Sequence, residues 1–192
     1  MWGALRARAL LLCAALVVPA LATVGAVGTP SVRAATPAGF QDDAVVTGLT
    51  QPTSVRFAPD GWAFVAEKGG LIKVFDGLAD PTPTVFADLT TNVDNFWDRG
   101  LLGLALDPGF SSGQPYVYAL YTYDAPIGGT APTWGDTCPT PPGATTDGCV
   151  VSGRLSRLTA DATGNVMVAG SEQVFLNDWC QQFPSHSIGA LA

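Results

Sequence analysis

The sequence is poor in charged side chains, and above all in basic ones. Lysine and arginine together number 9 in 192 residues, against 16 aspartates and glutamates. Three of the arginines, Arg6, Arg8 and Arg33, lie near the start, so residues 36–192 carry 6 basic and 16 acidic side chains, a net charge of −10. Such a surface repels phosphate backbones, so the composition argues against nucleic acid as a partner.

Histidine is almost absent as well. His186 is the only one, six residues before the end of the sequence, in a polar and aromatic stretch over residues 179–189. Histidine is the side chain whose ordinary pKa lies closest to neutrality, so a proton-transfer enzyme often needs one. Two interpretations of His186 are open, a catalytic base and a structural turn residue, and the choice between them decides what the protein does.

Several motifs that carry chemistry are missing. The sequence has no Asn-x-Ser/Thr sequon, no glycine motif that cradles phosphate and no zinc-type spacing of cysteine and histidine. Residues 109–113 match the Gly-x-Ser-x-Gly pattern of serine hydrolases, but a strand follows where that motif needs a helix, so we predict a turn. Residues 92–98 lack the spacing of an EF-hand. No metal site is predicted within this chain.

The first 35 residues have the pattern of a secretory signal peptide. A basic start at Arg6 and Arg8 precedes an apolar run over residues 9–27, followed by small-residue sites. An uncleaved membrane anchor is the alternative, since the run approaches spanning length. Pro19 and the small residues beyond it favour cleavage. We therefore predict a secreted, extracellular protein that is not embedded in a membrane after signal cleavage.

The cysteines suit an exported protein. Cys138 and Cys149 bracket a polar loop, and in an oxidising compartment a disulfide closing that loop contributes about 2–3 kcal/mol. A zinc pair is the alternative, but no second Cys/His pair is near in the sequence. The sequence therefore predicts a disulfide. Cys180 is left over, either as a buried thiol or paired with a residue that this chain does not contain.

Short strands dominate the rest of the chain, and no convincing amphipathic helix follows the signal. β-branched and aromatic runs joined by Pro-Asp-Gly and Gly-Gly turns predict strands at residues 54–57, 62–66, 71–75 and 84–89. A similar unit begins at residues 100–108 and continues with strands at 116–121, 153–158 and 173–176, interrupted by a Pro/Gly-rich insertion at about 124–151. A third start follows at residues 187–192.

These repeats predict an all-β fold. Pro59 and Pro108 are 49 residues apart, the length of one four-stranded propeller blade with its loops. A β-sandwich, which shows similar spacing, is the alternative. We predict that residues 36–192 form a partial β-propeller of about two and a half four-stranded antiparallel blades. Because propellers close with four to eight blades, the chain is expected to be the N-terminal part of a larger protein.

Four motifs occur in the same order as in the glucose/sorbosone dehydrogenase family, which the chain resembles from about residue 49 to residue 192. They are Pro59-Asp60-Gly61 and residues 69–74, 99–105 and 186–191. The family consists of secreted six-bladed propellers and includes soluble sugar dehydrogenases that depend on pyrroloquinoline quinone (PQQ). The resemblance implies a sugar (aldose) substrate, an electron acceptor and PQQ, with calcium bound through residues outside this chain.

The resemblance also implies site residues. His186 matches the histidine that takes the proton from the C1 hydroxyl of the sugar while a hydride passes to the quinone. Asp98 and Arg99 stand where the soluble glucose enzyme has a substrate-contacting glutamine and an asparagine. Asp98 can accept hydrogen bonds from a sugar and Arg99 can pair with a quinone carboxylate. A weak salt bridge between the two is the alternative.

Two functions therefore remain. The first is a secreted PQQ-dependent sugar dehydrogenase with His186 as general base. The second is a non-catalytic propeller that binds carbohydrate or protein, because propellers are general scaffolds. Trp97, Trp179 and Phe183 suit a sugar site or packing between blades equally well.

Overall fold

The computed structural model describes residues 36–138 and 149–192. The chain divides into two units, Met1–Asp42 and Asp43–Ala192. The predicted signal peptide lies outside the described residues, as does the middle of the insertion, residues 139–148. In the first unit, the Phe40 N–H donates a hydrogen bond of 3.0 Å to the Pro37 carbonyl. No helix in the two described ranges is long and apolar enough to cross a membrane.

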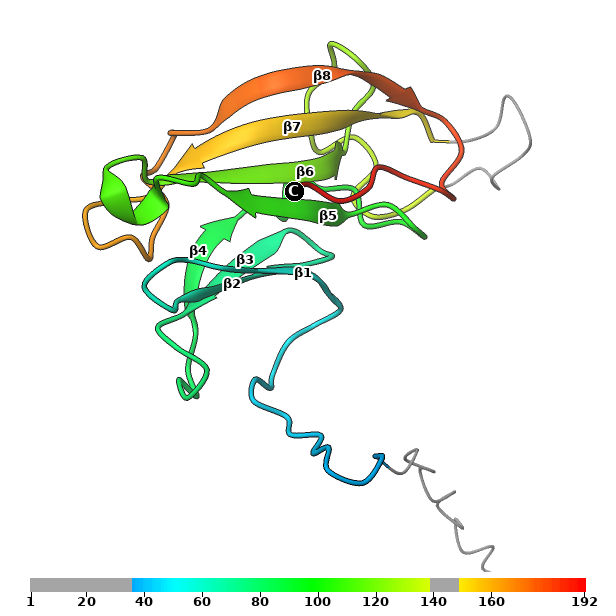
Figure 1. Cartoon of the computed structure of the whole chain (residues 1–192). Helices are drawn as coiled ribbons and strands as arrows, with labels where there is room; N and C mark the ends of the chain where they lie inside the picture. Colours follow the sequence, from blue (N-terminus) through cyan, green and yellow to red (C-terminus); the bar gives the residue numbers. More distant parts are fainter. Residues whose placement is uncertain (1–35, 139–148) are drawn as a thin grey trace, which may run out of the picture. The chain divides into compact units, whose positions relative to one another are not determined.

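The second unit contains two four-stranded antiparallel sheets (Figure 1). The first sheet consists of β1 (Pro52–Phe57), β2 (Ala63–Glu67), β3 (Leu71–Phe75) and β4 (Thr84–Asp88). The second consists of β5 (Leu101–Leu106), β6 (Tyr116–Tyr123), β7 (Val151–Thr159) and β8 (Gln173–Gln181). In both sheets the strands lie in sequence order, as in a propeller blade. The predicted all-β fold of four-stranded blades is confirmed.

Turn chemistry and burial on both faces define β2. The Gly61 N–H donates a hydrogen bond of 2.9 Å to the Ala58 carbonyl, and the Asp60 carboxylate accepts the Trp62 N–H. Gly61 has a φ of 94°, a conformation that favours glycine. All five residues of β2 are buried, because one face packs on the second sheet and the other on Val46 and Leu49.

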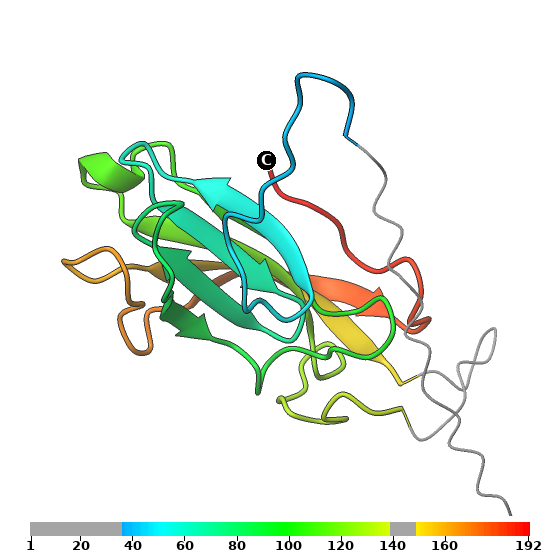
Figure 2. The same ribbon diagram turned by 90° about the horizontal axis from the view of Figure 1, so that it is seen from below.

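The main core lies between the two sheets, which are stacked on one another (Figure 2). The Phe64 ring meets the rings of Phe86 and Phe110 edge to face, with centroids 5.4 and 5.2 Å apart. The second sheet contributes Leu101, Leu104, Val117, Ala119, Tyr121, Tyr123 and Leu158. Each fully buried valine, leucine or phenylalanine of this cluster contributes about 1.5–3 kcal/mol, and the cluster takes side chains from both sheets.

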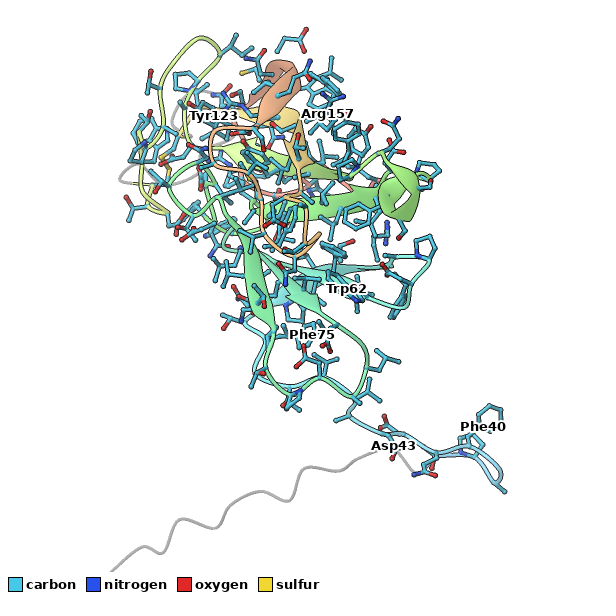
Figure 3. The ribbon with its side chains drawn as sticks, turned by 90° about the vertical axis from the view of Figure 1, so that its left-hand side faces the viewer. Phe40, Asp43, Trp62, Phe75, Tyr123 and Arg157 are labelled. Carbon is cyan, nitrogen blue, oxygen red and sulfur yellow. A yellow bond between two sulfur atoms is a disulfide. The ribbon has the colours of Figure 1, made fainter. Side chains whose placement is uncertain are left out.

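Arginines on β7 cover aromatic rings of β6. The Arg154 guanidinium lies 3.3 Å from the centre of the Tyr123 ring, and that of Arg157 lies 4.1 Å from the centre of the Tyr116 ring. Figure 3 shows Tyr123 and Arg157 on this sheet, Phe75 on the other, and Trp62 just before β2. Cation–π contacts of this kind stabilise by about 0.5–2 kcal/mol.

Each sheet keeps an apolar face exposed. On the first sheet the exposed side chains are Val55, Phe57 and Val85, with Leu78 of the β3–β4 connection, and on β8 they are Phe175, Leu176 and Trp179. Blades inside a closed propeller are covered on both faces, so these two surfaces are those on which neighbouring blades would pack.

The predicted disulfide between Cys138 and Cys149 is present. The insertion is also held by Asp124, whose buried carboxylate accepts the backbone N–H groups of Thr133, Trp134 and Gly135. Cys180 is free and exposed on β8, so the interpretation of it as a buried thiol is wrong.

Residues 187–192 form no strand, although the sequence predicts the start of a third blade there. A strand needs a backbone ladder, and in the described chain no strand pairs with this segment. The segment crosses β5 instead, where Gly189 approaches Gly103, and Arg56 of β1 donates a hydrogen bond to the Leu191 carbonyl. β8 is longer than predicted, because its second half pairs with Val151–Gly153.

Candidate functional site

Two loops meet at one end of the sheets. One joins β4 to β5 and contains Asp98, and the other follows β8 and contains His186. The Asp98 N–H donates a hydrogen bond of 3.2 Å to the Pro184 carbonyl. The His186 N–H donates one of 3.2 Å to Asp98 Oδ2. The structure therefore brings together two predicted site residues that lie 88 positions apart in the sequence.

Both loops contain a residue with left-handed backbone. Among the described residues, Trp97 (φ 52°) and His186 (φ 57°) are two of only four non-glycine residues with positive φ. Such a conformation costs about 1–3 kcal/mol and persists only where surrounding contacts impose it. Strained residues of this kind cluster at functional sites, so the pair marks this end of the sheets as a candidate site.

The His186 side chain is exposed and has one hydrogen-bond partner, the Ser185 hydroxyl, with Nδ1 and Oγ 3.1 Å apart. When Nδ1 carries the proton and donates to Ser185, the Nε2 lone pair stays available as an acceptor. In this tautomer the ring can take a proton from a hydroxyl group placed at Nε2.

Arg99 lies inside the protein. Its guanidinium is fully buried, with Nη1 2.9 Å from Asp94 Oδ2. Nη2 donates to three carbonyls, those of Cys149 (2.7 Å), Gln181 (3.2 Å) and Gln182 (3.1 Å). The salt bridge considered from the sequence, between Asp98 and Arg99, is wrong, since the acidic partner of Arg99 is Asp94. These contacts favour a structural role for Arg99 over contact with a ligand.

Burial affects both members of this pair. It raises the pKa of Asp94, against the opposing effects of the Phe96 N–H and the Arg99 guanidinium. It lowers the pKa of Arg99, which the Asp94 carboxylate opposes. Because each charge is the main compensation for the other inside the protein, loss of either leaves an unpaired buried charge.

The glycines of the Gly100-Leu101-Leu102-Gly103 motif allow close backbone approach. Gly100 has a φ of 146°, and a Cβ there would lie 2.6 Å from the Lys68 carbonyl oxygen. A Cβ on Gly103 would lie 2.8 Å from Leu120 Cβ and 3.0 Å from the Gly189 carbonyl oxygen. The motif therefore lets the loop before β5 contact the first sheet and lets the segment after His186 lie on β5.

Sequence reasoning missed three supporting residues. Lys68 Nζ donates to the Asn95 carbonyl (2.9 Å) and to its side-chain oxygen, and the Asn95 N–H donates to Asp136 Oδ1 (2.7 Å). Burial lowers the pKa of Lys68, while the carboxylates of Asp136, Asp94 and Asp98 act in the opposite direction. The polar composition of residues 92–95 was the only indication in the sequence of this hydrogen-bonded group.

Exposed aromatic rings lie in the same segments. Trp97 is 55% exposed and stacks on Phe96 with ring centroids 5.8 Å apart. Phe183, three residues before His186, is also exposed, and so is Trp179 near the end of β8. The Trp179 ring covers Gly153 of β7, so it packs on the open face of the second sheet.

Among the described residues, two cations contact these loops, and the protein itself binds both. Lys68 and Arg99, the cations closest to these loops, both bind oxygen atoms of the protein. Within residues 36–138 and 149–192, no three His, Cys, Asp or Glu side chains are grouped as metal ligands. The quinone carboxylates would therefore have to be bound by other residues.

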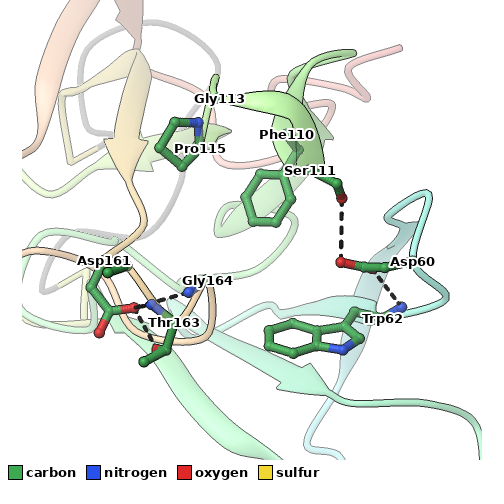
Figure 4. A pocket seen from close by; sticks show the side chains of 10 residues that line it. Asp60, Trp62, Phe110, Ser111, Gly113, Pro115, Asp161, Thr163 and Gly164 are labelled. Atoms are coloured by element: carbon green, nitrogen blue, oxygen red, sulfur yellow. Dashed lines mark hydrogen bonds between the residues drawn. The ribbon is translucent and has the colours of Figure 1, made fainter.

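A pocket lies at the opposite end of the sheets, between the β1–β2, β5–β6 and β7–β8 connections (Figure 4). Its volume is about 370 Å³, and Trp62 forms part of its wall. The carboxylates of this pocket stabilise the connections that line it. Asp60 accepts a hydrogen bond from the Ser111 hydroxyl, and Asp161 accepts hydrogen bonds from the backbone N–H groups of Thr163 and Gly164. Ser111 lies in the short 3₁₀ helix η1 (Phe110–Ser112), which leads into β6, so the predicted turn is present in place of a serine-hydrolase elbow.

Comparison with known families decides the identity of this fold. The model of the glucose/sorbosone dehydrogenase family matches residues 49–168. The chain belongs to that family. The match ends before His186, so the assignment of His186 depends on the loop geometry and on the motif at residues 186–191. None of the curated proteins compared with the chain matches it.

Solved structures of glucose and aldose dehydrogenases are also similar to the chain. A Thermus thermophilus protein assigned as an oxidoreductase (glucose dehydrogenase) is 29% identical, with a TM-score of 0.48, over 70% of this chain and 31% of its own. A glucose dehydrogenase is 18% identical (TM-score 0.49, 74% and 35%). The soluble aldose sugar dehydrogenase of Escherichia coli, in its apo form, is 13% identical (TM-score 0.44, 67% and 30%). The chain spans about a third of the length of these structures.

Proposed function

We propose that the protein is a secreted sugar dehydrogenase that oxidises the C1 hydroxyl of an aldose, with His186 as the general base. Family membership supports the reaction class. The observation that supports the residue is the contact between the two loops, in which Asp98 holds the backbone of a left-handed, exposed His186. The disulfide supports export, since such bonds persist in oxidising compartments.

His186 performs the proton transfer in this proposal. With Nδ1–H donating to Ser185, Nε2 accepts the proton of the C1 hydroxyl as the C1–H bond breaks. Asp98 is exposed beside it and can accept hydrogen bonds from neighbouring sugar hydroxyls. The exposed ring of Trp97 offers an apolar face to the sugar ring.

The hydride from C1 requires an acceptor, and PQQ is the one that family membership suggests. We assign the binding of the quinone, of calcium and of the final electron acceptor to parts of the protein beyond the described residues. Because the proton and the hydride leave the same C1–OH group, the acceptor would have to lie beside C1 of the sugar whose hydroxyl His186 contacts.

The test is dye reduction by the full-length protein, supplied with PQQ and calcium, over a panel of aldoses. His186→Ala should lower kcat by about 10²–10⁴-fold, the usual contribution of a general base. Thr163→Ala is the control for expression and folding, because Thr163 lies at the opposite end of the sheets. Full activity in His186→Ala contradicts the assignment of the base. A wild-type protein that binds sugar but neither binds PQQ nor reduces dye favours the non-catalytic binding propeller.

A further inference from the structure

We propose that Arg99 is a positioning residue for His186, and that the Cys138–Cys149 disulfide is part of the same support. A positioning role in catalysis rests on the proposed function of His186, but the structural coupling can be measured whether or not His186 is the base.

The Arg99 guanidinium joins three separate segments. Nη1 binds Asp94, in the middle of its own loop. Nη2 binds the carbonyl of Cys149, at the end of the insertion, and the carbonyls of Gln181 and Gln182, where β8 ends and the His186 loop begins. A guanidinium suits this arrangement because its donors form a planar fork, whereas a lysine ammonium is a compact point charge.

The His186 loop is bound at both ends by neighbouring residues. Arg99 holds the carbonyls at its start, and Asp98 binds the Pro184 carbonyl and the His186 N–H. Asp98 and Arg99 are adjacent, so the buried guanidinium limits where the Asp98 carboxylate can lie. Movement of Arg99 would therefore shift both contacts that hold His186 in its left-handed conformation.

The insertion supports the same loops at two points. The Cys149 carbonyl accepts the shortest of the three hydrogen bonds that Arg99 Nη2 donates, and the disulfide links Cys149 to Cys138. Two residues before Cys138, the Asp136 carboxylate accepts the N–H of Asn95. An insertion that otherwise lies outside the blade pattern thus contacts the loop that carries Asp98. Its disulfide therefore restrains one of the acceptors on which Arg99 depends.

The experiment uses the full-length protein and two readouts. The first is the imidazole NMR signal of His186, identified by its loss in His186→Ala. The second is kcat and KM for the best aldose. Arg99→Lys should shift or broaden the imidazole signal and lower kcat by about 10–100-fold, with KM changed by less than about threefold, because a misplacement near 1 Å has effects of this size. Cys138→Ser with Cys149→Ser should change the same signal and lower kcat less.

Arg157→Lys is the matched control. It makes the same substitution on β7, where the guanidinium covers Tyr116 and binds Gln173 away from both loops. It should leave the His186 signal and kcat unchanged. If Arg99→Lys does not fold, the double variant Arg99→Met with Asp94→Asn replaces it, because it removes both buried charges together and also the donors to the three carbonyls.

The outcomes separate the two proposals. A folded Arg99→Lys protein, or the folded double variant Arg99→Met with Asp94→Asn, whose His186 signal matches the wild type overturns the positioning role. A double serine variant with an unchanged signal overturns the part played by the disulfide. Full activity in His186→Ala overturns the proposed function alone, and the NMR criterion still decides the coupling.

Discussion

Substitution of Gly100 by alanine should destabilise the protein more than the same change at any other left-handed glycine of the loops. Gly100 has a φ of 146°, a region that alanine rarely adopts, and its Cβ would lie 2.6 Å from the Lys68 carbonyl oxygen and 2.7 Å from Lys68 Cγ. That carbonyl accepts the Leu101 N–H at 2.9 Å, so it cannot withdraw without loss of a contact between the sheets. Backbone strain of about 1–3 kcal/mol and overpacking of about 1–3 kcal/mol together predict a loss of about 2–6 kcal/mol.

Gly113→Ala is the matched control for this prediction. Gly113 also has positive φ (102°), but nothing lies within 4 Å of a Cβ there. It should cost about 1–2 kcal/mol, the cost of left-handed backbone alone. The assay is urea unfolding at equilibrium, with the free energy of unfolding extrapolated to water and the slope compared between variants. Equal losses in the two variants would refute the argument from close approach, and a loss below about 1 kcal/mol at Gly100 would refute the backbone argument as well.

Three further predictions concern stability. Phe64→Ala should lower the free energy of unfolding by about 3–5 kcal/mol in the same urea assay, because two edge-to-face ring contacts and a fully buried side chain are lost; Val166→Ala, at an exposed site in the β7–β8 connection, should cost much less. Cys138→Ser with Cys149→Ser should lower it by about 2–3 kcal/mol, measured against the oxidised wild type. The pKa of Asp161 is lowered, first by the hydrogen bond from the Thr163 hydroxyl and then by those from backbone N–H groups. The stability that the ionised carboxylate contributes is therefore fully present above the ordinary pKa of 3.8 and is lost as pH falls through the folded-state pKa. Asp161→Asn should therefore make Tm less dependent on pH below about 4, and an unchanged acid slope would contradict this.

The sheets could be predicted from the sequence because their signals are local. Runs of β-branched and aromatic residues predict the strands of the first sheet, the repetition of that unit predicts those of the second, and Pro59-Asp60-Gly61 predicts the first turn. The ends of β8 could not be predicted in this way. Asn177 and Asp178 resemble a strand end, yet the strand continues to Gln181 because β7 provides a partner backbone for it. Pairing across the sheet overrides the weak local preference of those residues.

The candidate site could be predicted only in part, since its contacts join residues far apart in the sequence. The motif at residues 186–191 indicates His186, but nothing local indicates that Asp98, 88 residues earlier, binds its backbone. The sequence also cannot distinguish an arginine that binds a ligand from one buried against carbonyls. Both have the same side chain in a polar loop, and only the fold places Cys149, Gln181 and Gln182 around Arg99.

Asp98, Arg99 and Gly100 are consecutive in the sequence, and each has a different structural task at the candidate site. Asp98 faces outward and binds the backbone of His186, Arg99 faces inward and joins three segments, and Gly100 lets the chain pass the Lys68 carbonyl. The contacts of each of these three residues require the other two to stay at their positions in the sequence. A shift of one residue would place the carboxylate inside and the guanidinium outside, leaving Asp94 unpaired in the core. The partners lie up to 88 residues away, but the geometric requirement is local. For this reason the short motif at residues 98–100 indicates the position of the candidate site, although His186 and the carbonyls that bind Arg99 lie elsewhere in the sequence.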